Sequence, residues 1–176
     1  MMNADGGVKM KREQFVKITE KTRAFVSRGA WAGVLLNVPT YLCAALYITS
    51  GLWLLGTRDA RVVRFALVPA ATFVLVTLLR RAINRPRPYD ALSFEPVGDA
   101  KRGKGLSMPS RHTASAAAIA FAFAYAFAHP AVMALCALLC VLVALSRVLK
   151  DVHYPSDVVV ALLFALVCAL MGYGCI

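Results

Sequence analysis

Apolar residues along this chain form five long runs separated by short polar segments. The runs cover residues 33–56, 62–79, 113–128, 131–145 and 158–175. A membrane hydrocarbon core of ~30 Å needs about 20 helical residues, and a lone strand in lipid would leave its backbone groups without hydrogen bonds. The pattern therefore predicts five transmembrane helices, and the shorter ones are tolerated if they continue as polar turns into a crevice lined by protein.

The third run alternates alanine with mainly aromatic and apolar residues, which is a period typical of a strand. At helical spacing the same run aligns Ala116, Ala120, Ala124 and Ala128 in one seam. Small residues let transmembrane helices approach one another closely. We therefore expect a helix at the centre of an all-α membrane bundle.

Residues 1–32 form a basic segment whose beginning we expect to be disordered. Phe15, Ile18 and Phe25 fall at helical spacing among lysines and arginines, which is typical of a helix lying on an anionic membrane surface. A solvated basic tail is the competing interpretation. The chain is thus divided into this interfacial segment and a membrane-embedded domain, residues 33–176.

Composition agrees with an integral membrane protein. Hydrophobic residues make up 60% of the 176 positions, charged residues 16%, and the mean hydropathy is +0.66, whereas soluble domains average about 25% charged residues. The net charge of +11 is concentrated outside the apolar runs, where such charge usually serves lipid head groups and membrane topology. A nucleic-acid partner is disfavoured because little soluble surface remains to bind one.

Three short polar segments carry nearly all the ionisable groups suited to catalysis. They are residues 80–88 (RRAINRPRP), 109–112 (PSRH) and 146–157 (SRVLKDVHYPSD), each at the end of an apolar run. Counting five crossings from the N-terminus places all three on the same face of the membrane. The sequence therefore predicts one composite site of arginines, two histidines and a carboxylate.

Arginine dominates this predicted site. Guanidinium groups pair bidentately with phosphate oxygens and keep their charge, and Ser110 with the amides that begin the third helix adds neutral donors. A bias of positive charge toward the membrane edge could also account for single arginines. We weigh the two interpretations equally for Arg85 and favour phosphate binding for Arg87 and Arg147.

Two of the three histidines lie on the charged face. Asp157 follows His153 by four residues, one helical turn, where it can hold an imidazole N–H and fix its tautomer. A histidine beside a phosphate is a candidate nucleophile or general acid. We predict that His153 attacks phosphorus and that His112 protonates the leaving oxygen, whereas His129 is interfacial. A pair of helix-capping residues is the competing interpretation.

No metal or other cofactor is expected. The nine acidic residues are scattered through tail and loops, so arginines are predicted to supply the charge that magnesium supplies in other phosphoryl transfers. The five cysteines have no histidine or carboxylate beside them at metal-ligand spacing. We interpret them as small buried hydrophobic residues.

Taken together, the three segments resemble the signature motifs of the type 2 phosphatidic acid phosphatase superfamily. They read Arg-x6-Arg-Pro in 80–88, Pro-Ser-Arg-His in 109–112 and Ser-Arg-x5-His-x3-Asp in 146–157. The superfamily includes bacterial lipid phosphate phosphatases and shares its pocket with vanadium-dependent haloperoxidases. The resemblance covers about the last two thirds of the chain.

The resemblance implies an all-helical bundle and a covalent phosphohistidine mechanism. It implies that His153 is the nucleophile, Asp157 its orienting partner and His112 the general acid. It further implies phosphate binding by Arg80, Arg87, Ser110, Arg111 and Arg147.

This chain departs from the family pattern at several points. Arg80 stands where lysine is usual, Arg111 replaces a common glycine, and Asp151 brings an acidic group close to the predicted nucleophile. The family core usually has six spanning helices, against five predicted here. Bacterial relatives generally face the site outward, whereas the basic N-terminal segment would make this site cytoplasmic by the positive-inside rule.

We therefore expect a metal-independent phosphatase in a bacterial cell membrane that acts on a lipid phosphate or diphosphate. Phosphatidic acid, phosphatidylglycerol phosphate and polyprenyl phosphates are the candidate substrates, because each can leave its tail in lipid while residues 89–108 cover its head group. A lipid-linked phosphotransferase that uses the same phosphohistidine is the alternative. A non-catalytic membrane scaffold or transporter subunit is less favoured, since it has no need for the two histidines and the aspartate.

Overall fold

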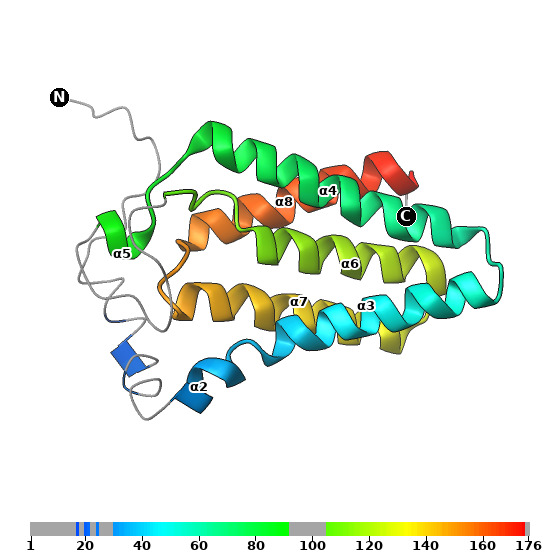
Figure 1. Cartoon of the computed structure of the whole chain (residues 1–176), viewed down its shortest axis with the longest axis horizontal. Coiled ribbons are helices and arrows are strands. Elements are labelled where there is room, and N and C mark those ends of the chain that lie inside the picture. Colours follow the sequence, from blue (N-terminus) through cyan, green and yellow to red (C-terminus); the bar gives the residue numbers. More distant parts are fainter. Residues whose placement is uncertain (1–16, 18–19, 22–23, 25–29, 92–104, 175–176) are drawn as a thin grey trace.

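The long helices of the chain lie side by side along the longest axis of the molecule (Figure 1). The structure, a computed structural model, describes residues 17, 20, 21, 24, 30–91 and 105–174. Its helices are α2 (Ala30–Leu35), α3 (Val38–Gly56), α4 (Arg61–Ile83), α5 (Pro88–Ala91), α6 (Arg111–Phe127), α7 (Pro130–Leu149) and α8 (Pro155–Tyr173). The described part of the chain contains no strand, and the predicted all-α bundle is confirmed.

Four spans within the described residues are long and apolar enough to cross a membrane: Gly33–Gly56, Arg61–Ala91, Pro130–Leu149 and Pro155–Tyr173. Each coincides with one of the predicted apolar runs. The remaining run is α6, which has only 17 residues and packs against α4, α7 and α8. A short helix is tolerated there because protein surrounds it on several sides.

The predicted alanine seam of α6 is wrong in detail. Of its four members only Ala116 is buried, and Ala128 lies beyond the helix with a positive φ of 47°. The alanines that are buried lie on several faces: Ala114, Ala116, Ala117, Ala118, Ala122 and Ala126. A spacing of four residues drifts around a helix of 3.6 residues per turn, and the neighbours of α6 cover more than one face.

The predicted amphipathic helix over residues 9–32 lies almost wholly outside the described residues. Lys17, Glu20, Lys21 and Ala24 are helical. The next described element is α2, which is separated from α3 by a turn at residues 36–37.

Large apolar side chains cover the outside of the bundle. Leu52, Leu67 and Leu163 are exposed, and Met171 is 83% exposed. Such a surface is too extensive for a soluble monomer and suits contact with lipid tails.

The interior near the α3–α4 turn contains Phe65, whose ring packs edge-to-face against that of Phe123, with ring centroids 5.6 Å apart.

One end of the bundle is closed by a charged clamp. Arg61 forms an ion pair with Asp59 at 2.6 Å and donates a hydrogen bond to the carbonyl oxygen of Ala126. This clamp ties the α3–α4 turn to the end of α6. The hydrogen bonds from Arg61 lower the pKa of Asp59 to about 2.

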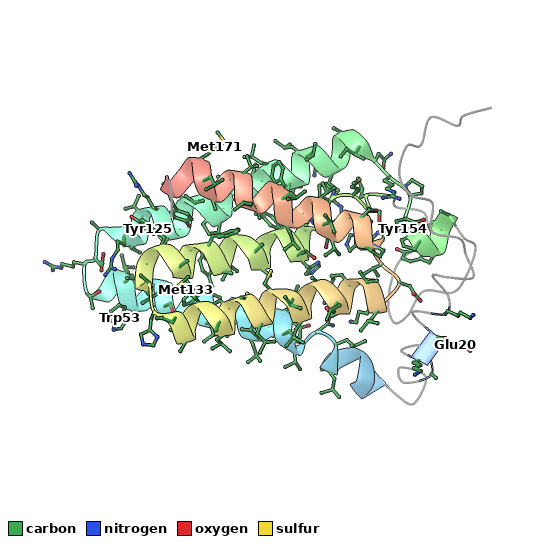
Figure 2. All side chains as sticks on the ribbon, turned by 180° about the vertical axis from the view of Figure 1, so that it is seen from behind. Glu20, Trp53, Tyr125, Met133, Tyr154 and Met171 are labelled. Carbon is green, nitrogen blue, oxygen red and sulfur yellow. The ribbon has the colours of Figure 1, made fainter. Side chains whose placement is uncertain are left out.

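The predicted site residues gather at the opposite end. Figure 2 shows Tyr154 at the end that carries α5, far from Trp53 and Met133. At this end α4, with its C-terminal residues, faces the beginnings of α6 and α8 and the end of α7 (Figure 1). α4 ends because Asn84 adopts the left-handed conformation, with φ 44° and ψ 40°, which asparagine tolerates better than most residues.

Candidate active site

Backbone hydrogen bonds join the charged segments at this end of the bundle. The Ser107 N–H donates to the carbonyl of Arg85 at 2.8 Å, and the Ser110 N–H donates to the carbonyl of Asp157 at 3.1 Å. The first bond links the end of α4 to the segment before α6, and the second links that segment to α8. The structure therefore brings the three segments together, as the count of crossings predicted.

Asp157 lies at the centre of these contacts and is fully buried, at 0% exposure. Its Oδ1 accepts from Arg85 Nη1 at 2.8 Å, and its Oδ2 accepts from the Tyr154 N–H at 2.9 Å and from the Ser107 hydroxyl. A buried carboxylate needs such partners to offset its lost hydration. The bond from Tyr154 also caps α8, so Asp157 is at once a capping residue and a neighbour of His153.

His153 lies on the turn between α7 and α8 and is buried at 2% exposure. Its Nδ1 is 3.6 Å from Asp157 Oδ2, which is longer than a hydrogen bond. Among the described residues Nδ1 has no hydrogen-bond partner, and Asp157 lies within ion-pair distance of it. Burial lowers the pKa of His153, which favours the neutral imidazole that a nucleophile requires.

His112, by contrast, has an exposed side chain on the first turn of α6. It lies with Arg111 at the polar part of a cavity of about 200 Å³ whose other walls are largely apolar. Phe73, Ile119 and Val143 are among the lining residues. The cavity extends between α3, α4, α6 and α7, from the charged end toward the lipid-facing part of the bundle.

The predicted phosphate-binding arginines come from three helices and from the segment that precedes α5. Arg80 is buried at the end of α4, Arg111 begins α6, Arg147 is buried at the end of α7, and Arg87 precedes α5. The charges of Arg87 and Arg111 act on Arg80. Those of Arg80, Arg111 and Arg147 act on His112 and disfavour its protonated form. Cations that repel one another in this way form a site suited to an anion.

Two of these arginines are held by backbone or side-chain acceptors. Arg87 Nε donates to the carbonyl of Gly105 at 3.1 Å. Arg147 Nε donates to Ser146 Oγ at 3.2 Å, and its Nη2 donates to Asn37 Oδ1 at 2.9 Å. Fixed guanidinium orientations reduce the entropy lost when an anion binds.

Arg85 contacts the carboxylate of Asp157. Besides its ion pair with Asp157, it donates to Ser156 Oγ at 2.9 Å and stacks on the Tyr154 ring at 4.2 Å. These contacts direct Arg85 to the carboxylate and not to the arginine cluster. From the sequence we weighed phosphate binding against a positive charge at the membrane edge for Arg85, and neither interpretation describes its contact with Asp157.

Ser110 begins α6 as its N-cap. Its Oγ accepts from the Thr113 hydroxyl at 3.0 Å and from the Thr113 N–H at 3.5 Å. The Ser110 hydroxyl proton is therefore not used in these bonds and can serve an anion at the helix N-terminus, where the helix dipole also attracts negative charge.

Other predictions fall outside this cluster. His129 is exposed at the start of α7, at the far end of the bundle, as expected of an interfacial residue. Asp151 is buried on the turn that precedes His153, with φ 60°. Most of the predicted lid, residues 92–104, lies outside the described residues. Within them, no three or more His, Cys, Asp or Glu are grouped so as to hold a metal ion.

Sequence reasoning missed two polar residues of this site. Ser107 bonds Asp157 from within the predicted lid, and Asn37 bonds Arg147 from the first apolar run. A polar residue interrupting that run was the only signal for Asn37. For Ser107 the sequence offers no signal that we can identify.

Comparisons with known proteins agree with this architecture. A family model described as the PAP2 superfamily matches residues 61–176. The crystal structure of Aquifex aeolicus LpxE is similar, with a TM-score of 0.71 and 25% identity over 98% of each chain. A transmembrane PAP2-type phosphatidylglycerolphosphate phosphatase from Bacillus subtilis has a TM-score of 0.68 and 21% identity, over 93% of this chain and 84% of that one, a likeness of fold. No curated protein matches the chain.

Proposed function

The chain belongs to the PAP2 superfamily, and from this premise we propose that it hydrolyses a lipid phosphate or diphosphate through a phosphohistidine intermediate. It is a multi-pass membrane phosphatase, and the proposal concerns its substrate class, its residues and its chemistry. We assign the reaction to the membrane-embedded part, residues 33–176, in a bacterial cell membrane. The solved relatives come from Aquifex aeolicus and Bacillus subtilis.

The observation that carries the proposal is the cavity beside His112. The cavity has a volume of about 200 Å³. Arg111 and His112 lie at its polar part, and its remaining walls are largely apolar. A substrate with a phosphate head and an apolar tail would place the head among the arginines and the tail along these walls. The alcohol oxygen that joins the two would then lie next to His112, where a general acid is needed.

In the first step His153 attacks phosphorus. Its Nδ1 faces Asp157 at 3.6 Å, so Nε2 is the nitrogen free to attack. A bond forms between Nε2 and phosphorus while the bond from phosphorus to the lipid oxygen breaks. The bound phosphate dianion offsets the arginine charges that disfavour a proton on His112, so His112 can carry one. Protonated His112 gives this proton to the lipid oxygen, and the lipid leaves as an alcohol, or as a phosphate when the substrate is a diphosphate.

In the second step water replaces the histidine. Neutral His112 takes a proton from the water as its oxygen attacks phosphorus, and the bond from phosphorus to Nε2 breaks. Inorganic phosphate leaves, and both histidines return to their starting protonation states. Asp157, which is ionised through its bonds to Arg85 and Ser107, stabilises the positive imidazole ring of the intermediate.

The arginines bind the transferred group in both steps. Arg80, Arg87, Arg111 and Arg147 supply positive charge around the phosphoryl oxygens, and Ser110 with the first amides of α6 supplies neutral donors. Preorganised donors of this kind stabilise the charge of the trigonal-bipyramidal transition state. No metal ion is required in this scheme because guanidinium groups neutralise that charge.

Phosphatidic acid, phosphatidylglycerol phosphate and polyprenyl phosphates are the candidate substrates. The second of these takes support from the Bacillus subtilis structure, whose protein is a phosphatidylglycerolphosphate phosphatase. All three have a phosphomonoester or diphosphate head on an apolar tail, as the cavity requires.

The test uses the purified protein in detergent with this panel of lipids and measures released inorganic phosphate. We expect His153→Ala to abolish release from every lipid, and His129→Ala, a matched change at the far end of the bundle, to retain it. Activity should persist in EDTA. Near wild-type release by His153→Ala would overturn the nucleophile assignment, and activity lost in EDTA and restored by magnesium would overturn the metal-independent scheme. Phosphate that is transferred to an added alcohol and not released would identify a phosphotransferase.

A further inference from the structure

We infer that Asn37 is a positioning residue of the phosphate site, which holds Arg147 and Lys150 together without cancelling the charge of either. The inference rests on the proposed function, because it assigns Arg147 to phosphate binding. Asn37 lies on the turn between α2 and α3, outside the three motifs and outside the residues that the family model matches.

A single oxygen atom makes both contacts. Asn37 Oδ1 accepts from Arg147 Nη2 at 2.9 Å and from Lys150 Nζ at 2.9 Å. Arginine and lysine side chains are donors only, so the amide oxygen, and not its NH₂ group, must face them. Two cations are thereby brought to one acceptor from positions more than 100 residues along the chain.

These contacts leave part of Arg147 available to a ligand. Nε donates to Ser146 Oγ at 3.2 Å, and Nη2 donates to Asn37 and, at 3.3 Å, to Thr40 Oγ1. Three of the five N–H groups are thus used, and no acceptor among the described residues contacts Nη1. Arg147 is 7% exposed, so the orientation of its guanidinium is set by these three acceptors before any phosphate binds.

The neutrality of Asn37 matters as much as its position. Two adjacent cations repel each other, and an acidic residue would relieve that repulsion more strongly than an amide does. A carboxylate would also cancel one unit of the positive charge that attracts a phosphate dianion. An asparagine holds the pair and preserves its net charge, which is what an anion site requires.

A positioning role of Asn37 and a merely structural one predict different effects of substitution. In Asn37→Asp the tether remains, with charge-assisted bonds in place of neutral ones, so the thermal stability should be equal to or above that of the wild type. KM for a lipid phosphate, and the inhibition constant of inorganic phosphate, should nevertheless rise by about tenfold because one positive charge is cancelled. In Asn37→Ala both constants should rise and the melting temperature should fall.

His129→Asp is the matched control. His129 is exposed at the N-cap of α7, at the far end of the bundle, so this variant adds a negative charge away from the arginines, and it should leave both constants near wild type. If Asn37→Asp keeps wild-type KM and phosphate inhibition, the contact is only structural and the inference is overturned. The same holds if His129→Asp raises both constants as much as Asn37→Asp does.

The experiment also distinguishes failure of this inference from failure of the proposed function. Binding of inorganic phosphate, measured by the thermal shift that it induces, needs no turnover. If the wild type binds phosphate and releases none from any lipid, the proposed function fails while Asn37 is still tested by the loss of that shift in Asn37→Asp. An undiminished shift in Asn37→Asp overturns the inference whatever the activity.

Discussion

Replacement of Arg85 by alanine tests what this arginine does in the site. Arg85 donates to Asp157 at 2.8 Å and to Ser156 at 2.9 Å, and it stacks on Tyr154 at 4.2 Å. If these contacts define its role, it positions the carboxylate beside His153 and does not bind phosphate. The variant should therefore impair the chemical step more than substrate binding.

The size of the effect follows from burial. Removing one partner of a fully buried ion pair costs ~3–5 kcal/mol. The side chain of Arg85 is 28% exposed, and Ser107 and the Tyr154 N–H still donate to Asp157, so we expect a smaller loss of stability, ~2 kcal/mol. A carboxylate that moves by ~1 Å from its working position can reduce a catalysed rate by up to ~10²-fold. We therefore expect kcat to fall by between ~10-fold and ~10²-fold, with KM changed little.

The assay is steady-state release of phosphate from the best lipid substrate, at a temperature where both proteins are folded. Arg147→Ala, which alters a proposed phosphate ligand, is the comparison and should raise KM. Arg85→Lys should recover part of kcat because a lysine can reach Asp157 but cannot reproduce the second bond and the stacking. The reasoning would be refuted if Arg85→Ala raised KM and weakened inhibition by inorganic phosphate while kcat stayed the same.

Two further predictions concern stability. A Cβ added at Gly172 would lie 2.5 Å from a methyl carbon of Val68, so Gly172→Ala should destabilise the bundle by ~1–3 kcal/mol and lower the melting temperature. Gly56→Ala is the control, because a Cβ there would have nothing within 4 Å, and it should leave the melting temperature unchanged. Equal melting temperatures of the two variants would contradict this packing. Arg61 lowers the pKa of Asp59 from 3.8 to about 2, so the contribution of their ion pair is fully present above pH 3.8 and is lost as the pH falls toward 2. The difference in unfolding free energy between the wild type and Asp59→Asn should accordingly shrink over that range, and a constant difference would show that the pair does not contribute in this way.

Residue types and their local spacing were enough to predict which residues gather in the candidate site, while their catalytic roles stay predictions. The pairs His153–Asp157 and Ser110–Arg111 are close in sequence, and their chemistry is evident without a structure. The apolar runs likewise predicted the helices, because a membrane leaves few other ways to satisfy backbone hydrogen bonds. The count of crossings then placed the three segments at one end.

The remaining features depend on distances between helices, which no local pattern encodes. Asn37 meets Arg147 across 110 residues, and Ser107 meets Asp157 across 50. The buried faces of α6 could not be chosen in advance either, since nearly all of its residues are small or apolar and hydropathy alone does not distinguish them. The role of Arg85 was ambiguous for a similar reason, because its acceptor, Asp157, lies 72 residues further along the chain.

Asp157 accepts a hydrogen bond from Arg85 at its carboxylate and one from the Ser110 N–H at its backbone carbonyl, and these bonds also bear on the synthesis of the protein. The turn carrying His153 and the first turn of α8 come after every other helix of the bundle in the order of translation. A nascent chain that has inserted α3 to α7 already holds the arginines of α4, α6 and α7 but lacks His153, the proposed nucleophile, and Asp157. In the proposed mechanism, phosphatase chemistry therefore begins only when α8 enters the bilayer, and a chain that lacks α8 is inert toward the surrounding lipids.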